Sequence, residues 1–156
     1  MHDKNEVAMT NDNGAALFTW PSDRPKLIGS KCKKCDEVVF PARLQCPKCY
    51  AETMEETQLS TIGKVYSFTI SYLAPWTMYE GTVPYAFGHV ELPEKVLIPC
   101  RFSSELKSGE IPPLPIGTEV KLAIEEWGVD EKDKDNMVMM HTFKALKRKD
   151  VTGKKE

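Results

Sequence analysis

Four cysteines arranged as two Cys-x-x-Cys pairs constrain this sequence more than any other feature. Cys32 and Cys35 form the first pair, and Cys46 and Cys49 form the second pair after ten intervening residues. Each pair can wrap around one side of a cation, because two intervening residues are about what a tight metal-binding turn needs. Four thiolates suit a tetrahedral zinc ion and fill its coordination sphere, so no position stays open for catalysis. The pattern therefore predicts one structural zinc ion held by these four side chains.

Two other uses of the four cysteines stay open at this point. Iron in a rubredoxin-like site would take the same ligands. Two disulfides would need an oxidising compartment. Residues 1–13 are polar and lack the apolar core of a signal peptide, and no apolar run approaches the length of a membrane span. We therefore expect a soluble, cytoplasmic protein, which disfavours the disulfides.

The net charge of -2 conceals an uneven distribution along the chain. Residues 24–50 carry seven Lys and Arg against two acids, whereas residues 51–143 carry seven against fifteen. The cysteine region is thus basic (+5) and the following body is acidic (-8). A protein that holds long nucleic acid usually has a broadly basic binding face, so the acidic body argues against that function.

The segment around the cysteines predicts a zinc ribbon with a lead-in, over residues 17–56. Residues 1–16 contain few large apolar side chains, so we expect them to be disordered or loosely ordered. Short strands are predicted at 26–31 and 38–41, on either side of the first cysteine pair. Zinc ribbons are built from two such metal-binding turns on short hairpins.

The pattern after Cys49 is typical of a closed β domain, over residues 57–147. Strands are predicted at residues 62–72, 85–92, 96–102, 118–127 and 137–146. Residues 103–117 leave room for at most a short helix near 104–107, and residues 128–136 read as a solvated loop. Five strands without a long helix favour a Greek-key barrel of the OB type, with a β-sandwich as the alternative. The predicted fold is therefore mainly β, and residues 148–156 form a basic tail.

Alternation along the predicted strands assigns side chains to faces. In 62–72, Tyr66, Phe68, Ile70 and Tyr72 share one face, while Val65, Ser67, Thr69 and Ser71 share the other. In 118–127, Val120, Leu122 and Ile124 point inward. In 96–102, Cys100 shares a face with Val96, Ile98 and Phe102, which favours a buried core thiol.

The sequence offers little for catalysis. Cys100 is the only cysteine outside the two pairs, and the candidate bases His89 and His141 fall within predicted strands. Strand histidines usually satisfy local hydrogen bonds, and no nucleophile elbow, phosphate loop or dinucleotide fingerprint occurs. We expect no catalysis from this chain alone.

Two features have the composition of binding surfaces. The loop 73–81 carries Trp76, Met78 and Tyr79, and such aromatic and Met side chains are typical of protein interfaces. Folding of this loop back onto the barrel is the alternative. The basic side chains near the metal, Lys31, Lys33, Lys34, Arg43 and Lys48, could meet the phosphates of CoA, or could instead offset the negative charge of a zinc ion with four thiolates.

Several short motifs, in this order, resemble a known family. They are Cys-Lys-Lys-Cys at 32–35, Val-Phe-Pro-Ala-Arg at 39–43, Cys-Pro-Lys-Cys at 46–49, Gly-Lys-Val-Tyr-Ser-Phe-Thr at 63–69, Pro-Tyr at 84–85 with Val-Glu-Leu at 90–92, and Ile-Gly-Thr-Glu-Val at 116–120. Together they resemble the acyl-CoA-associated OB-fold proteins with an N-terminal rubredoxin-like zinc ribbon, over about residues 17–147. Departures are a shortened lead-in and the acidic loop Asp130–Asp135.

The resemblance implies a non-catalytic partner of a CoA-ester enzyme. Such proteins bind a thiolase-fold or hydratase-fold subunit, often as a heterotetramer, and are thought to help hold or admit the CoA ester. Within the family, the short chain looks most like the small subunits of thiolases, which belong to acyltransferase complexes. Membrane partners are not expected.

A nucleic-acid-binding module is the competing interpretation. OB barrels bind single strands through basic grooves and stacked aromatic side chains, here Tyr66, Phe68 and Tyr85, and zinc ribbons occur beside such barrels. The acidic body and the lack of Lys or Arg between these aromatic residues argue against it. A rubredoxin-type electron carrier is a third reading, which a colourless protein with one zinc ion would exclude.

Overall fold

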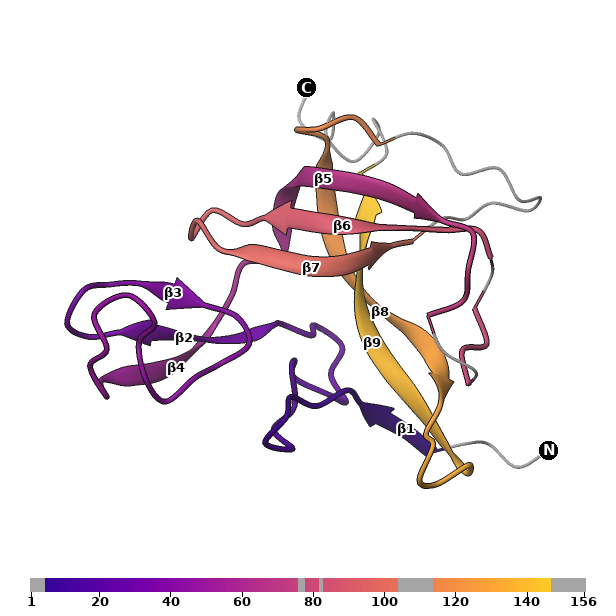
Figure 1. Ribbon diagram of the computed structural model, residues 1–156, viewed down its shortest axis with the longest axis horizontal. Helices are drawn as coiled ribbons and strands as arrows, with labels where there is room; N and C mark the ends of the chain where they lie inside the picture. The colour runs from indigo at the N-terminus through magenta and orange to yellow at the C-terminus, as the bar shows by residue number, and fades with distance from the viewer. Residues whose placement is uncertain (1–4, 76–77, 82, 104–113, 147–156) are drawn as a thin grey trace.

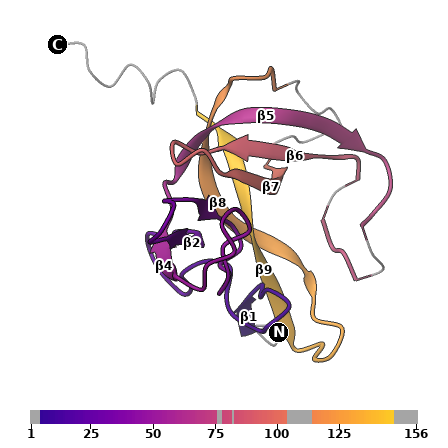
Figure 2. The ribbon, with the colours of Figure 1, turned by 60° about the vertical axis from the view of Figure 1, so that its left-hand side comes forward.

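The computed structural model describes residues 5–75, 78–81, 83–103 and 114–146, and all regular structure among them is β. A three-stranded sheet, the ribbon, lies beside a larger barrel (Figure 1, Figure 2). The short helix considered at 104–107 and the tail 148–156 lie outside the described residues. None of the described residues belongs to a helix long and apolar enough to cross a membrane.

Five strands close the barrel, as the sequence predicts. They are β5 (Ile62–Ser71), β6 (Tyr85–Glu91), β7 (Leu97–Phe102), β8 (Glu119–Val129) and β9 (Asn136–Ala145). β5, β6 and β7 pair in antiparallel order, β7 pairs with β9 in parallel, and β8 joins β9 to β5. This closed order confirms the OB-type barrel and excludes the sandwich, because the circuit of pairings leaves no second sheet opposite the first.

The ribbon sheet contains one strand that the sequence pattern did not indicate. β2 (Ile28–Cys32) pairs on one side with β3 (Val38–Val39) and on the other with β4 (Met54–Gln58). The sequence of β4, Met-Glu-Glu-Thr-Gln, lacks the alternation of a half-buried strand because it is an edge strand with mostly exposed side chains.

Residues 1–16 were expected to be loosely ordered, but the structure places a strand among them. β1 (Asn5–Ala8) runs parallel to β9, from Asn5 opposite Asn136 to Ala8 opposite Met139. Main-chain hydrogen bonds from Asn5 N to Asp135 O (3.0 Å) and from Met9 N to Met139 O (2.9 Å) continue the pairing. Backbone pairing of this kind leaves no apolar pattern in the sequence, so composition alone could not reveal it.

The ribbon and the barrel share one hydrophobic core. Phe18 and Leu27 from the lead-in and Leu59 from the connection belong to the same cluster as the barrel residues Val65 and Ile98. All five are at most 2% exposed. The ribbon residues Val38 and Phe40 are partly buried and pack against this same cluster, so the two units bury apolar surface against each other.

The expected division of faces along β5 is wrong near its middle. Val65 is 1% exposed and Tyr66 is 55% exposed, yet Phe68 packs inward with its ring centroid 5.6 Å from that of Phe102. A register shift between Val65 and Ser67 causes this, because one extra residue reverses the faces that follow. The alternation predicted for β7 is confirmed, since Val96, Ile98, Cys100 and Phe102 are all buried.

Candidate metal centre and surrounding surfaces

Two similar turns present the four cysteines. In the first, Cys32 N donates to Glu37 O (2.8 Å) and Asp36 N donates to Cys32 O (2.9 Å). In the second, Cys46 N donates to Ala51 O (2.9 Å) and Tyr50 N donates to Cys46 O (2.9 Å). Each turn ends in a left-handed residue with φ of 61°, Asp36 or Tyr50. The repeated geometry turns both cysteines of each pair toward one point.

The four thiol groups fit a tetrahedral metal ion. All four Sγ atoms lie within 4.8 Å of one another, with Cys32 3.7 Å from Cys49 and Cys35 3.5 Å from Cys46. A zinc ion about 2.3 Å from each sulfur sets neighbouring sulfurs about 3.8 Å apart. All five cysteines are free, and the sulfurs are too far apart for disulfide bonds of about 2.05 Å. The ribbon is therefore positioned to bind one metal ion.

Hydrogen bonds favour the thiolate form at Cys32 and Cys46, whereas burial and hydrogen bonds with the other thiols raise the pKa of Cys35 to about 12. A hydrogen bond with the hydroxyl of Thr53, 3.4 Å from Cys32 Sγ, is the main cause that lowers the pKa of Cys32 to about 6. The backbone N–H of Cys49 is the main cause that lowers the pKa of Cys46. Protons and the metal ion compete for the same sulfur atoms, so both of these lowered pKa values favour metal binding.

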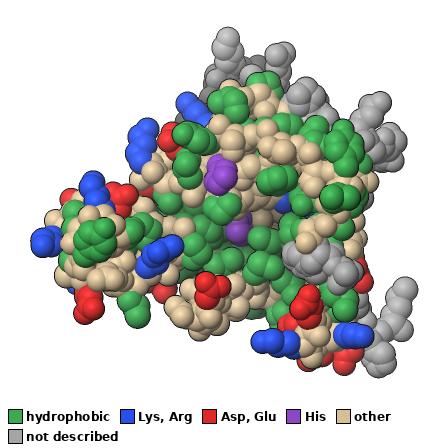
Figure 3. All heavy atoms as spheres, viewed as in Figure 1, with side chains coloured by type: hydrophobic (Ala, Val, Ile, Leu, Met, Phe, Trp, Pro, Cys, Tyr) green, Lys and Arg blue, Asp and Glu red, His purple; other side chains and the backbone are tan. Residues whose placement is uncertain are grey.

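Acidic side chains pair with several of the lysines around the metal. Lys33 Nζ lies 2.6 Å from Glu55, Lys48 Nζ lies 3.4 Å from Glu37, and Lys31 Nζ lies 3.8 Å from Asp36. No ion pair links Lys34 or the Arg43 side chain to a described carboxylate. Figure 3 shows Lys and Arg side chains around the ribbon, interspersed with Asp and Glu. The predicted contacts of Lys33, Lys34, Arg43 and Lys48 with CoA phosphates stay a prediction.

Part of the loop between β5 and β6 folds back on the barrel. Tyr79 forms a bridge with Gly128, and Val129 N donates to Met78 O (3.3 Å). The Tyr79 ring also contacts Trp127, with centroids 5.2 Å apart. Trp76 lies outside the described residues. Of the side chains expected at a partner interface, Met78 and Tyr79 are therefore partly buried against β8, whereas Tyr72 and Leu73 are 73% and 79% exposed.

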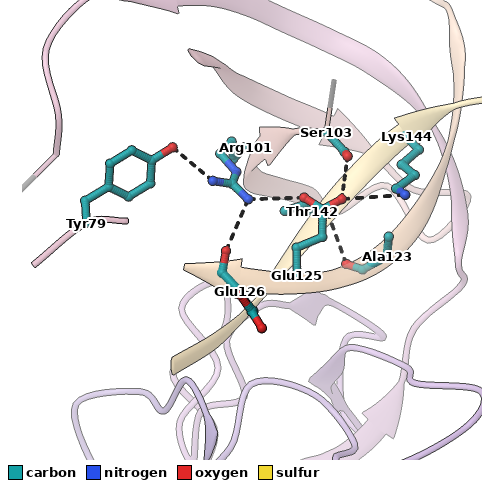
Figure 4. Close-up of polar contacts among 8 residues, drawn as sticks. All are labelled: Tyr79, Arg101, Ser103, Ala123, Glu125, Glu126, Thr142 and Lys144. Carbon is teal, nitrogen blue, oxygen red and sulfur yellow. Dashed lines mark hydrogen bonds and ion pairs between the residues drawn. The ribbon is translucent and has the colours of Figure 1, made fainter. Parts of the chain in front are cut away.

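A charged cluster that the sequence did not reveal lies beside Tyr79 (Figure 4). Arg101 from β7 reaches across β9 to Glu125 on β8 (3.1 Å) and donates to the Tyr79 hydroxyl (2.9 Å). Glu125 also accepts a hydrogen bond from Ser103 and lies 3.6 Å from Lys144. The Arg101 side chain is 11% exposed and lies over the Trp127 ring at 5.0 Å. A cavity of about 220 Å³ borders this cluster.

Alternation along β7 is the signal that could have been used, since it puts Arg101 on the face opposite Cys100. Periodicity assigns a face but not a neighbour, so it could not bring Arg101 to Glu125 across β9.

The candidate catalytic groups are not assembled into a site. Cys100 is 6% exposed inside the barrel, and burial raises the pKa of its thiol to about 12. His89 lies on the exposed outer side of β6, where Nδ1 is 2.9 Å from Ser67 Oγ. His141 is buried, with Nε2 2.7 Å from Pro99 O, and burial lowers its pKa. No hydrogen bond joins Cys100 to either histidine.

The aromatic platform considered for nucleic acid is split between two faces. Phe68 packs inside the barrel, whereas Tyr66 is exposed and Tyr85 contacts Tyr79 with ring centroids 5.6 Å apart. Stacking of successive bases needs rings on one open surface. These three side chains do not provide one.

Comparison with known proteins identifies two matching family models that together follow the two structural units. Residues 20–55 match the rubredoxin-like zinc ribbon domain of ChsH2, and residues 56–125 match the C-terminal OB-fold domain of ChsH2. A solved structure titled Ltp2-ChsH2(DUF35) aldolase is similar with a TM-score of 0.56 and 23% identity. The match covers 77% of this chain and 84% of the chain in the solved structure, and the two share the same fold.

Curated relatives carry two kinds of name. The benzoylsuccinyl-CoA thiolase subunit BbsA of Thauera aromatica is 40% identical over 53% of this chain and 56% of that protein. The protein of that name from Geobacter metallireducens is 32% identical over 78% of this chain and 76% of its own length. A DUF35 domain-containing scaffold protein of Methanocaldococcus jannaschii is 44% identical over 46% and 51%. The matches to the Thauera and Methanocaldococcus proteins thus span about half of those proteins.

Proposed function

Because this chain belongs to the ChsH2/DUF35 family of zinc-ribbon and OB-fold proteins, we propose that it is a non-catalytic accessory subunit of an enzyme that acts on CoA esters. Its partner is a thiolase-type catalytic subunit, and the complex is a heterotetramer that works as an acyltransferase. Benzoylsuccinyl-CoA thiolase, of anaerobic toluene degradation, is the specific enzyme that the resemblance and the names of two relatives favour.

The state of Cys100 carries the non-catalytic part of the proposal. Thiolytic chemistry needs a thiolate that can reach a thioester, with a base nearby. The Cys100 thiol is enclosed by the barrel core, has a pKa of about 12 and has no histidine in hydrogen-bonding contact. The other four cysteines are committed to the metal centre. The nucleophile of the complex therefore comes from the partner.

Exposed apolar side chains at one end of the barrel support a protein partner. Ser71 pairs with Tyr85, so Tyr72 and Leu73 leave the sheet beside Val83 and Pro84. Tyr72, Leu73 and Val83 are 73%, 79% and 44% exposed. Met78 and Tyr79 attach the returning part of this loop to β8, which limits the conformational entropy that these residues lose on association. Trp76, in the same loop, belongs to this proposed interface.

Handling of acyl-CoA is the second part of the role. The side chains of Lys34 and Arg43, without a described acidic partner, are available for phosphate groups, whereas Lys33 and Lys48 would first have to leave Glu55 and Glu37. Binding of CoA by the ribbon should therefore depend more on Lys34 and Arg43 than on the two paired lysines.

The test is purification of the tagged chain from its native lysate, followed by mass spectrometry and a thiolysis assay. We expect a stoichiometric thiolase-type subunit, and we expect Cys100→Ala to leave the kcat of the reassembled complex unchanged within about twofold. Loss of activity in a folded Cys100→Ala complex would contradict the non-catalytic role. Recovery of nucleic acid or of replication and translation proteins would favour a single-stranded nucleic-acid-binding module instead.

A further inference from the structure

The two metal-binding turns give their first cysteines the same backbone hydrogen bond. In each turn the backbone N–H of the second cysteine bonds to Sγ of the first, from Cys35 to Cys32 and from Cys49 to Cys46. A metal ion with four thiolates carries a net negative charge, which such donors partly offset. The backbone therefore treats the two halves of the metal centre alike.

Thr53 adds a side-chain hydrogen bond to one half only. Its hydroxyl oxygen lies 3.4 Å from Cys32 Sγ. Cys46 follows Cys32 by 14 residues, so the counterpart of Thr53 after the first cysteine pair is Val39, whose side chain has no hydrogen-bond donor. In the part of the chain that the structure describes, no side-chain hydroxyl bonds to Cys46. Thr53 thus makes the centre asymmetric.

The backbone holds Thr53 beside the first turn. Lys33 N donates to Thr53 O (3.0 Å), which extends the pairing of β2 with β4 one residue beyond Cys32 opposite Met54. The Thr side chain is β-branched, so its χ1 angle has few favourable values and little rotamer freedom is lost when the hydroxyl meets the sulfur. The position of this hydroxyl is therefore set by the sheet and does not depend on the metal.

We propose that Thr53 is a positioning residue of the metal centre, whose hydroxyl donates a hydrogen bond to the Cys32 thiolate and holds that sulfur toward the ion. Donors behind a metal ligand fix the direction of the ligand and stabilise its charge, and removal of such a donor typically weakens metal binding. This role concerns the metal centre itself and does not depend on the proposed accessory function.

The test removes and restores the hydroxyl in the full chain. Thr53→Val keeps the shape of the side chain, and it displaces no neighbour because Thr53 is exposed. We expect it to weaken zinc binding about tenfold, the low end of the range for such donors, since solvent also reaches this site. Thr53→Ser should stay within about threefold of wild type because it keeps the donor. Competition with a chromophoric chelator measures these affinities.

Thr57→Val is the matched control. It makes the same substitution within β4, where Thr57 pairs with Gly29 and has no hydrogen bond to a sulfur in the described chain. Its zinc affinity should equal that of the wild-type protein.

Cobalt(II) in place of zinc gives a readout that a merely structural role would not change. Its sulfur-to-metal charge-transfer band depends on the energy of the thiolate electrons, which a hydrogen bond lowers. Thr53→Val and Thr53→Ala should therefore both move this band to longer wavelength. Thr53→Ser and Thr57→Val should leave the band at its wild-type position.

Three outcomes would overturn the proposal. One is wild-type zinc affinity with an unmoved cobalt band in Thr53→Val. Another is an equal loss of affinity in Thr53→Ser and Thr53→Val, because the hydroxyl would then not be what the centre needs. If Thr53→Val does not fold, Thr53→Ala provides the same comparison, and an unmoved band in that variant would reject the role of Thr53.

Discussion

His141 is a neutral imidazole enclosed where the ribbon meets the barrel. The Pro99 carbonyl can only accept a hydrogen bond, so His141 Nε2 carries the proton and Nδ1 is an unprotonated acceptor. Nδ1 is buried and has no hydrogen-bond partner in the described chain, and the ring meets Phe40 of the ribbon edge to face at 5.5 Å. Protonation would place an unpaired charge in this contact.

Stability should therefore fall as the pH drops below about 6.5. Burial lowers the pKa of His141 in the folded protein, so below pH 6.5 the unfolded chain takes up a proton that the folded chain does not. One such group contributes a slope of up to about 1.4 kcal/mol per pH unit. Urea unfolding between pH 8 and pH 5 measures this dependence.

Two variants isolate the contribution of His141. His141→Phe should flatten the pH dependence between pH 7 and pH 5, whereas His89→Gln, which removes an exposed histidine, should retain it. An equal slope in the wild-type and His141→Phe proteins would assign the effect to carboxylates instead.

At the scale of strands, the sequence predicted most of the barrel because its strands alternate. β6, β7, β8 and β9 lie within two residues of their expected bounds. β1 and β4 were not predicted because edge strands are held by backbone hydrogen bonds, with little apolar patterning. The faces of β5 were misassigned at Phe68 because a bulge is a property of the pairing with β6.

The cluster of Arg101 and Glu125 ties β7 to β8 across β9. Arg101→Met should lower the free energy of unfolding by about 2 to 3 kcal/mol, because it leaves a largely buried Glu125 with only Lys144 and Ser103. It should also remove the hydrogen bond from Arg101 to the Tyr79 hydroxyl and weaken partner binding through the loop. Chemical denaturation, together with the affinity for the catalytic subunit, measures both effects.

Lys95→Met is the matched control, since Lys95 pairs with Glu91 at 3.9 Å on the surface. It should change stability by less than about 0.5 kcal/mol. Equal effects of the two substitutions would mean that the buried cluster contributes no more than an exposed ion pair.

For the whole molecule, the order of two units followed from the cysteine spacing and the strand pattern, and the family followed from the resemblance of several short motifs to known proteins. The shared core could not be predicted, because nothing in the sequence around Phe18, Leu27 and Leu59 indicates that they pack against the barrel. For the candidate site, spacing was enough to select Cys32, Cys35, Cys46 and Cys49, since local turns bring ligands together. The neighbours of Arg101 depend on pairing between strands that are far apart in the sequence, so the sequence pattern could not predict them.

Loss of the metal should destabilise the barrel as well as the ribbon. Cys46→Ser, or a strong zinc chelator, removes the free energy that metal binding adds to folding of the ribbon. Because the core is shared, we expect the melting temperature of the barrel to fall too, in one calorimetric transition. Metal analysis should find one zinc ion per colourless wild-type chain. Unchanged metal content and melting in Cys46→Ser would refute the site, and two separate transitions would refute the coupling.

The strand β1 also has a consequence for solubility. It covers β9 from Asn136 to Met139, and β7 continues along β9 at Thr142 and Phe143. Without β1, the edge of β9 at Met137, Val138 and Met139 would carry unpaired backbone N–H and C=O groups beside apolar side chains. Exposed strand edges of this kind pair with strands of other molecules. A protein shortened at its N-terminus is therefore expected to form aggregates during expression and storage even where its barrel still folds.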